Sequence, residues 1–212
     1  MWLKPKLQAE LTWQNRWARE LAEHDPDWAK SKAYWEEYRY LDILRTLDIE
    51  RALDVGSGIS TGLRFLDCET AIAMDPLMPW YQNLCDYPGI ESIRGDGEDI
   101  PYDDGLFDLV LCTNVLDHTR DPVRVMDEIL RVTAPNGHIM VSVDVWGEAN
   151  TEIRDPAHPH RMTLGDVQSF TESVTTRRFQ STKRKGVREY VLGMDGPQDG
   201  AMVCGLFRKG TE

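Results

Sequence analysis

From residue 51 onward, short apolar runs alternate with segments whose apolar residues recur at helical spacing. Apolar runs bounded by turn residues predict strands at 51–55, 70–75, 91–94, 107–112 and 137–144. The intervening segments predict helices near 60–66, 78–86, 121–132 and 163–173. This alternation is typical of a Rossmann-like α/β fold, in which a mostly parallel sheet carries helices on both faces.

The first 48 residues have a different pattern, with helical spacing and many aromatic rings. Residues 7–23 predict one helix, and Asp25-Pro26 predicts the cap and first turn of a second helix. That second helix places five apolar residues on one broad face: Trp28, Trp35, Tyr38, Leu41 and Leu44. The rings either pack the helices onto the main domain or roof a ligand pocket. We expect residues 1–48 to form a helical extension or lid, and residues 49–212 to form the main domain.

The pattern of the last third of the chain predicts mainly β-strands. Residues 176–208 contain apolar runs that would complete the sheet, among them Tyr190–Leu192, and Gly193–Gly200 predicts a hairpin loop. Ahead of it, Ala134–Gly137 predicts a turn that leads into the strand at 137–144.

The composition of the chain limits the classes of molecule that it is expected to bind. The formal net charge of −12 disfavours nucleic acid and favours a small-molecule substrate. No stretch is apolar enough to span a membrane or to form the core of a signal peptide, so we expect no membrane partner. The four cysteines are widely spaced, which predicts buried free thiols and a reducing cytoplasm: Cys68, Cys85, Cys112 and Cys204.

The most informative motif lies where the first predicted strand meets a glycine turn. Asp54 precedes Gly56 and Gly58, and the next strand ends at Asp75. Glycines let the backbone approach a ligand closely, and an acid after the second strand can accept hydrogen bonds from ribose hydroxyls. A dinucleotide fingerprint would need a third glycine at position 61, where the chain has Thr61. Asp54 suits a ligand with an ammonium group, such as the methionine end of S-adenosylmethionine.

Two further segments place polar residues after strands. Gly95–Tyr102 follows the third predicted strand, where a carboxylate and a backbone N–H could read an adenine edge. The strand within Phe107–His118 delivers polar residues to the carboxyl edge of the sheet, where open α/β sheets bind ligands.

Taken in order, these motifs resemble the class I S-adenosylmethionine-dependent methyltransferases, in particular their small-molecule branch. The resemblance rests on Asp-x-Gly-x-Gly at 54–58, Asp-Pro at 75–76, Gly-Asp-Gly-Glu-Asp-Ile-Pro at 95–101 and Phe-Asp-Leu-Val followed by Asn-Val-Leu-Asp-His within 107–118. It covers roughly residues 50–145. The family often has a third glycine at position 60, where this chain has Ser60.

The resemblance implies roles for the matching residues. Asp54, Gly56 and Gly58 would flank the methionine part of the cofactor, Asp75 would hold the ribose hydroxyls, and Pro76 would lie beside the adenine. Asp96 and Gly97 would read the adenine edge, and the neighbouring Glu98 would also bind the cofactor. Asn114 would border the sulfonium and its methyl group.

Methyl transfer to an oxygen needs alignment of donor and acceptor and removal of the acceptor's proton. His118, just beyond the fourth strand, is one candidate base, although it could equally hold a loop. His158 and His160 flank a proline after the fifth strand, where they could bind substrate, act as base, or join Asp117 or Asp144 at a metal. A rigid connector is the plainer reading of this segment. His-x-His with scattered acids is not a specific ligand pattern, so we expect no metal.

We therefore predict a methyltransferase that uses S-adenosylmethionine to methylate a small molecule of sugar or natural-product type at oxygen. Two alternatives stay open. One is a non-catalytic module that binds S-adenosylmethionine or S-adenosylhomocysteine. The other is an NAD-dependent oxidoreductase, which would share the sheet and the ribose-binding acid.

Overall fold

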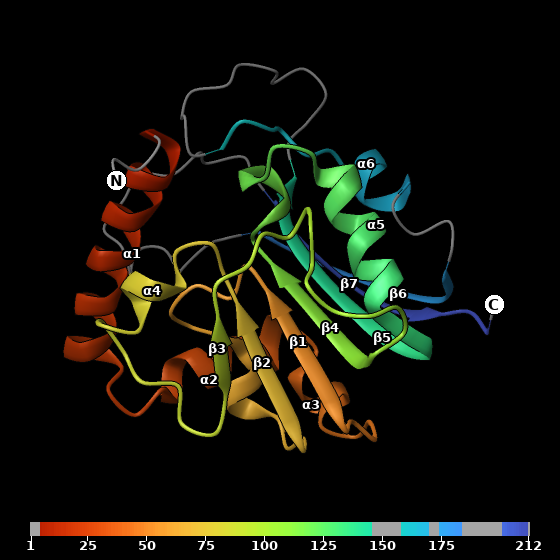
Figure 1. Cartoon of the computed structure of the whole chain (residues 1–212), viewed down its shortest axis with the longest axis horizontal. Coiled ribbons are helices and arrows are strands. Elements are labelled where there is room, and N and C mark those ends of the chain that lie inside the picture. Colours follow the sequence, from red (N-terminus) through yellow and green to blue (C-terminus); the bar gives the residue numbers. More distant parts are fainter. Residues whose placement is uncertain (1–4, 146–157, 170–173, 184–200, 212) are drawn as a thin grey trace.

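One mixed sheet organises the chain in a computed structural model that describes residues 5–145, 158–169, 174–183 and 201–211 (Figure 1). Its seven described strands are ordered β3-β2-β1-β4-β5-β7-β6. Their bounds are β1 Arg51–Val55, β2 Thr70–Met74, β3 Glu91–Ile93, β4 Phe107–Thr113, β5 Thr133–Val145, β6 Val174–Lys183 and β7 Ala201–Lys209. The predicted Rossmann-like α/β class is confirmed, and each of the five predicted strands is present.

The first five strands, β1 to β5, are parallel to one another. The remaining two strands are joined to the sheet through antiparallel pairs with β7. β1 lies between β2 and β4, with Asp54 opposite Ala73 on one side and Leu111 on the other. β5 pairs parallel with β4 and antiparallel with β7, which in turn pairs antiparallel with β6. Because parallel strands share one direction, the carboxyl ends of β1, β2, β4 and β5 meet at one edge of the sheet.

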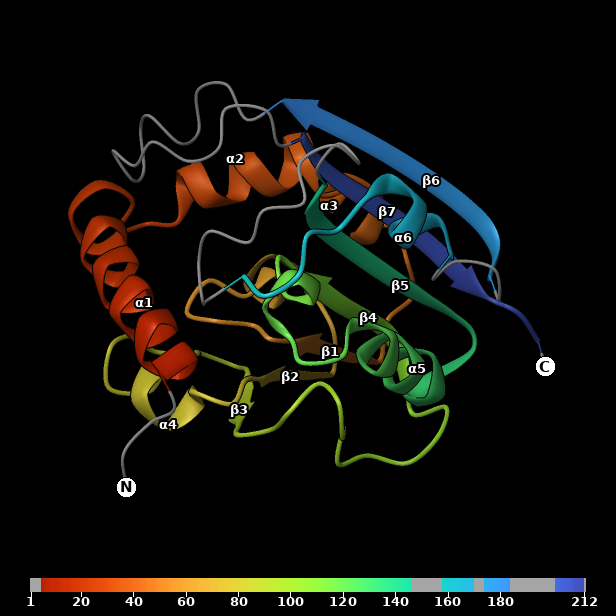
Figure 2. The same ribbon diagram turned by 90° about the horizontal axis from the view of Figure 1, so that it is seen from above.

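Helices cover both faces of the sheet (Figure 2). The described helices are α1 Pro5–His24, α2 Ala29–Tyr38, α3 Leu41–Leu44, η1 Gly62–Phe65, α4 Met78–Tyr81, η2 Leu116–His118, α5 Pro122–Val132 and α6 Leu164–Ser169. Helices α5 and α6 bury Ile129 and Val167 in one core cluster with the strands. On the opposite face, α2 and α3 bury Trp35 and Leu41. The strands are therefore buried on both sides, as their apolar runs predict.

Helix α1 packs beside the carboxyl edge of the sheet and next to α4 (Figures 1 and 2). Its Leu11 and Leu21 belong to a third core cluster with Ile59, Leu77 and Tyr81. These partners lie on the glycine turn and in the α4 region. The N-terminal helix is thus packed against the part of the main domain that follows β1 and β2.

The second N-terminal helix differs from its prediction. It is two helices, because Arg39 and Tyr40 interrupt it, with Tyr40 at a φ of 54°. Its first turn begins after Trp28, so Asp25-Pro26 is not the cap and first turn. Asp25 instead accepts hydrogen bonds from the backbone N–H groups of Lys30 and Ser31 at 2.9 and 2.8 Å. The Asp25 carboxylate, which lies in the preceding loop, therefore accepts hydrogen bonds from the free N–H groups of the first helical turn. The sequence pattern did not predict this arrangement.

Other elements are shorter or differently built than predicted. The segment 60–66 forms only the 3-10 helix η1, whose first turn is fixed by Thr61 Oγ1 accepting from the Leu63 N–H. The helix predicted at 78–86 ends at Tyr81, although backbone hydrogen bonds of mixed three- and four-residue spacing continue to Cys85. The predicted turn at 134–137 lies within β5, where Asn136 has a φ of 65° beside a shift in the β4–β5 register.

Helix α5 begins as predicted. Asp121 caps it by accepting a hydrogen bond from the Arg124 N–H at 3.1 Å, and a proline occupies its first turn. The helix predicted at 163–173 is α6, and residues 170–173 lie outside the described residues. The predicted strand at Tyr190–Leu192 and the loop at Gly193–Gly200 also lie outside them.

All four cysteines are free thiols, as predicted. Cys112 and Cys204 are buried, whereas Cys68 and Cys85 are only partly buried. Among the described helices, none is both long and apolar enough to cross a membrane.

Candidate functional site

The glycine turn after β1 is held against the end of β2. The N–H groups of Gly56 and Ser57 both donate to the Met74 carbonyl, at 2.8 and 3.1 Å. Gly56 has a φ of +68°, and a Cβ built on it would lie 2.5 Å from Val115 Cγ2. The turn therefore needs glycine at this position both for its backbone conformation and for the close approach of the segment after β4.

Asp54 lies fully buried at the base of this turn. Thr61 Oγ1 donates to its Oδ2 at 2.7 Å, while Oδ1 has no hydrogen-bond partner in the described part of the chain. Burial raises the pKa of Asp54 to about 7, against the opposing effects of the Thr61 hydroxyl and the Arg39 charge. A buried carboxylate oxygen without a partner is suited to a cationic or hydrogen-bond-donating ligand.

Asp75 is the second buried acid at this edge. Its Oδ2 accepts from the Gly58 N–H at 3.1 Å and its Oδ1 from the Leu77 N–H at 2.8 Å, so the side chain ties the glycine turn to the start of α4. Burial raises its pKa to about 7 despite these two bonds, and the charges of Glu10 and Asp54 add to the increase. Each carboxylate oxygen can accept a further bond, so ribose hydroxyls remain suitable partners.

Helix α1 brings residues to the turn that the sequence motifs did not identify. A Cβ built on Gly58, whose φ is +55°, would lie 3.3 Å from Gln14 Nε2. Gln14 donates to Glu10 at 2.9 Å, and Trp17 Nε1 lies 3.4 Å from Ser60 Oγ. At least one aromatic residue of the extension therefore contacts the glycine turn. The helical pattern alone carried no signal for these contacts, because it specifies a buried face and not its partner.

The predicted adenine-edge residues lie on a loop joined to the start of α5. Asp96 is about half exposed and pairs with Arg120 at 3.0 Å. Glu98 accepts from the backbone N–H groups of Arg120 and Asp121 at 2.7 and 3.1 Å, and these bonds with the Arg120 guanidinium lower its pKa although its partial burial opposes them. A Cβ built on Gly97 would lie 3.0 Å from Val55. The loop thus approaches the end of β1.

Pro76 and Asn114 follow β2 and β4 at the same edge. Both are partly buried. Asn114 has a φ of +60°, and its N–H donates to the Ser142 carbonyl of β5 at 2.6 Å. A positive φ at a non-glycine residue is uncommon, and such conformations concentrate at ligand sites. Together with the glycine turn, Asp54 and Asp75, the structure places the residues after β1, β2 and β4 on one edge.

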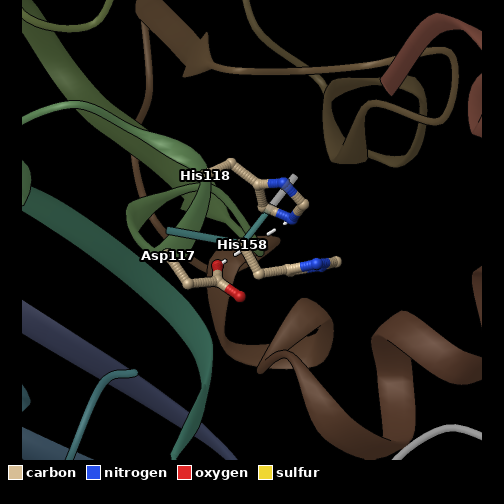
Figure 3. A group of neighbouring side chains, drawn as sticks. All are labelled: Asp117, His118 and His158. Atoms are coloured by element: carbon tan, nitrogen blue, oxygen red, sulfur yellow. Dashed lines mark ion pairs between the residues drawn. The ribbon is translucent and has the colours of Figure 1, made fainter. Parts of the chain in front are cut away.

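Two of the three predicted histidines meet beside this edge (Figure 3). The ring centroids of His118 and His158 lie 4.2 Å apart, and His118 Nε2 is 3.9 Å from Asp117 Oδ1. His118 Nδ1 is 3.4 Å from Glu10 Oε2 on α1. Sequence reasoning identified both histidines but did not place them in contact.

His160 has a different environment. Its Nε2 lies 3.1 Å from the Arg120 carbonyl, and its N–H donates to the Asp117 carbonyl at 3.3 Å. Val145 forms an isolated parallel bridge with Met162. These contacts fasten the segment after residue 157 between η2 and the end of β5, which holds His158 next to His118.

Comparisons with known proteins point to a methyltransferase domain. Residues 53–141 match the family model of a methyltransferase domain. An uncharacterised methyltransferase from Mycobacterium sp. (strain KMS) is 43% identical over 58 residues. That match covers 27% of this chain and 23% of the relative, so the chain spans less than a quarter of that protein's length.

Solved structures share the fold across most of the chain. A Thermotoga maritima S-adenosylmethionine-dependent methyltransferase, described as a possible histamine N-methyltransferase, has a TM-score of 0.58 at 16% identity, covering 85% of this chain and 95% of that one. The cyclase SpnF has a TM-score of 0.60 at 18% identity, covering 82% of each chain. At these identities the likeness shows the fold alone. Residues 53–141 of this chain thus resemble a methyltransferase domain, on a fold that S-adenosylmethionine-dependent methyltransferases share.

Proposed function

We propose that this protein transfers a methyl group from S-adenosylmethionine to an oxygen of a small-molecule acceptor. The observation that carries the proposal is the meeting of two buried carboxylates, Asp54 and Asp75, with the Gly56–Gly58 turn at the carboxyl edge of the sheet. The family of the domain favours this cofactor over the nicotinamide alternative. When bound, the cofactor supplies an activated methyl group on a sulfonium.

The residues present fit such a molecule. The unpartnered Oδ1 of Asp54 suits the ammonium of the methionine part, directly or through a water. Asp75 has spare acceptor capacity for the ribose hydroxyls. We propose that Asp96, Gly97 and Glu98 border the adenine.

The acceptor would bind where Asn114 and His118 follow β4. Positioning is the main task of the protein, since the leaving group is already activated, and alignment of this kind can contribute roughly 7–11 kcal/mol. We propose that His118 or His158, whose ring centroids lie 4.2 Å apart, takes up the acceptor's proton. For His160 we propose a positioning role, because the Arg120 carbonyl already engages its ring.

We further propose that residues 1–48 act as a lid over the cofactor. Support comes from Gln14 and Glu10 of α1, which face Gly58 and His118 respectively. A lid at this position would exclude water from the reacting atoms. The free thiols are consistent with a cytoplasmic location, and the net charge of −12 favours a small molecule over nucleic acid.

Calorimetry with S-adenosylmethionine and S-adenosylhomocysteine tests the cofactor assignment. We expect saturable binding of both, weakened by about 1–3 kcal/mol in Asp75→Ala. Thermal unfolding of the variant is needed beside it, because Asp75 also holds the Gly58 and Leu77 N–H groups. Asp103→Ala, which alters an exposed acid, is the control. Absence of saturable binding to the wild type would refute the assignment.

A turnover screen tests the reaction itself. Formation of S-adenosylhomocysteine is measured with sugars, phenols, carboxylates and amines as acceptors. Turnover with hydroxyl acceptors that falls in His118→Ala supports oxygen methylation. Turnover only with amines would contradict the oxygen assignment, and cofactor binding without any turnover would favour the non-catalytic module.

A further inference from the structure

The cluster of Asp117, His118 and His158 has the composition of a metal site. Its three donor groups offer atoms that all lie within 4.8 Å of one another, and Figure 3 shows the two imidazole rings with the carboxylate beside them. Metal binding was the least favoured role for these histidines on sequence grounds. The sequence could not show that residues from two separate segments converge.

Asp117 gives an independent reason to expect a cation. Its side chain is only 5% exposed, and its Oδ1 has no hydrogen-bond partner in the residues that the structure describes. His118 Nε2 lies 3.9 Å from that oxygen, beyond hydrogen-bond distance. A buried carboxylate oxygen and a ring nitrogen that face each other across this gap leave room for a bridging ion.

Glu10 lies where metal-binding histidines usually have an outer carboxylate partner. Its Oε2 lies 3.4 Å from His118 Nδ1, on the side of the ring away from Asp117. Histidine ligands commonly direct their second nitrogen at a carboxylate, which fixes the tautomer and leaves the other nitrogen free to ligate. With neutral imidazoles, Glu10 and Asp117 give the cluster two negative charges, which a divalent cation would neutralise.

We propose that Asp117, His118 and His158 bind a divalent first-row transition-metal ion such as Zn²⁺. Two imidazoles and one carboxylate suit Zn²⁺ or Fe²⁺ and are a poor set for Mg²⁺ or Ca²⁺, which prefer oxygen ligands. Donors of a tetrahedral zinc site stand about 3.4 Å apart. The His118–Asp117 pair at 3.9 Å would therefore close by about 0.5 Å on binding, a small adjustment for side chains.

Three protein ligands leave a coordination position open at the carboxyl edge of the sheet. If the protein methylates an oxygen, as proposed above, this position would bind the hydroxyl oxygen of the acceptor. Coordination would lower the pKa of a bound hydroxyl, so its proton would pass to solvent water, and His118 and His158 would act as ligands in place of the base role proposed above. The acceptor class would then be a molecule with a hydroxyl that can coordinate a metal, such as a phenol or a vicinal diol.

Titration of chelator-treated protein with Zn²⁺, and with Co²⁺ for its visible absorption, tests the site without cofactor present. We expect one ion per chain, with binding lost in His118→Ala and His158→Ala and weakened about 10-fold in Glu10→Gln. His24→Ala is the matched control, because His24 pairs with Glu20 and Glu23 outside the proposed cluster. Its affinity should equal that of the wild type.

A second measurement on the wild type avoids dependence on variant folding. Diethyl pyrocarbonate modifies accessible histidines, and mass spectrometry locates the modified residues. Zn²⁺ should protect His118 and His158 and leave His24 reactive. Absence of saturable metal binding, equal affinity in His158→Ala, or protection confined to other histidines would overturn the proposal. Because cofactor binding is measured separately in metal-free protein, a failed metal site leaves the methyltransferase assignment intact.

Discussion

The two buried carboxyl groups at the glycine turn predict that the ligand-free protein loses stability as the pH rises from about 5 to about 8. Asp54 and Asp75 both have a pKa of about 7 in the folded protein, against a usual value of 3.8. Between these values the folded state keeps protons that the unfolded chain releases. The stabilising contribution is therefore complete below the unfolded pKa and is lost as the pH rises through about 7.

The magnitude follows from the shift. One pKa unit corresponds to about 1.4 kcal/mol, and the slope decreases as the pH approaches 7, so each carboxyl contributes about 2 kcal/mol of change between about pH 5 and pH 7. The two groups also act on each other, because the Asp54 charge raises the pKa of Asp75. Their effects should therefore be less than additive in the double variant.

Urea unfolding at several pH values measures this dependence. The free energy of unfolding should fall as the pH rises toward about 7.5, and Asp54→Asn should reduce the slope while Asp103→Asn, at an exposed position, should leave it unchanged. Below about pH 4.5 the trend should reverse, because Glu98 and Glu128 have lowered pKa values and lose their favourable contacts when protonated. A wild-type stability that stays constant or increases from about pH 5 to pH 7 would refute the reasoning.

Two further substitutions, each with a control, test the residues that hold the glycine turn and the loop at Ile100 in place. Gly56→Ala should destabilise the fold by about 2–4 kcal/mol, through its positive φ and the Val115 methyl 2.5 Å from the new Cβ. Gly89→Ala has a similar φ of +73° but open space around it, so in chemical unfolding it should cost only about 1–2 kcal/mol; equal losses would contradict a steric role for Val115. Glu128→Ala should cost about 3 kcal/mol, because the buried carboxylate accepts from Arg131 at 2.8 Å and from the Ile100 N–H at 2.9 Å. Asp104→Ala removes only the exposed partner of Arg131 and should cost under about 1 kcal/mol in the same assay; a loss as large as that of Glu128→Ala would contradict this account.

Local sequence was sufficient for the parallel part of the sheet and for the order of the motifs along it. Strand β1 runs over Arg51–Val55 as predicted, because an apolar run bounded by turn residues has few other ways to be buried. The positions of Asp54 and Asp75 at one edge follow directly, since adjacent parallel strands present their carboxyl ends together.

Local rules failed at the start and the end of the second N-terminal helix. Asp25 was predicted to cap a helix in its own turn, but it satisfies the N–H groups of Lys30 and Ser31 from outside. The second helix ends at Tyr38 even though its apolar pattern continues to Leu44. A hydrophobic period fixes which residues are buried and leaves open where the backbone bends to bury them.

What the sequence by itself determined is the sheet, the glycine turn and the two acids beside it, because these depend on residues a few positions apart and on the geometry of parallel strands. Only the tertiary structure decided that Glu10 of α1 reaches His118, and that His158 joins His118 and Asp117. These contacts connect three segments far apart in the chain. Such contacts depend on how whole helices and strands pack together, and the local spacing of residues in the sequence does not specify that packing.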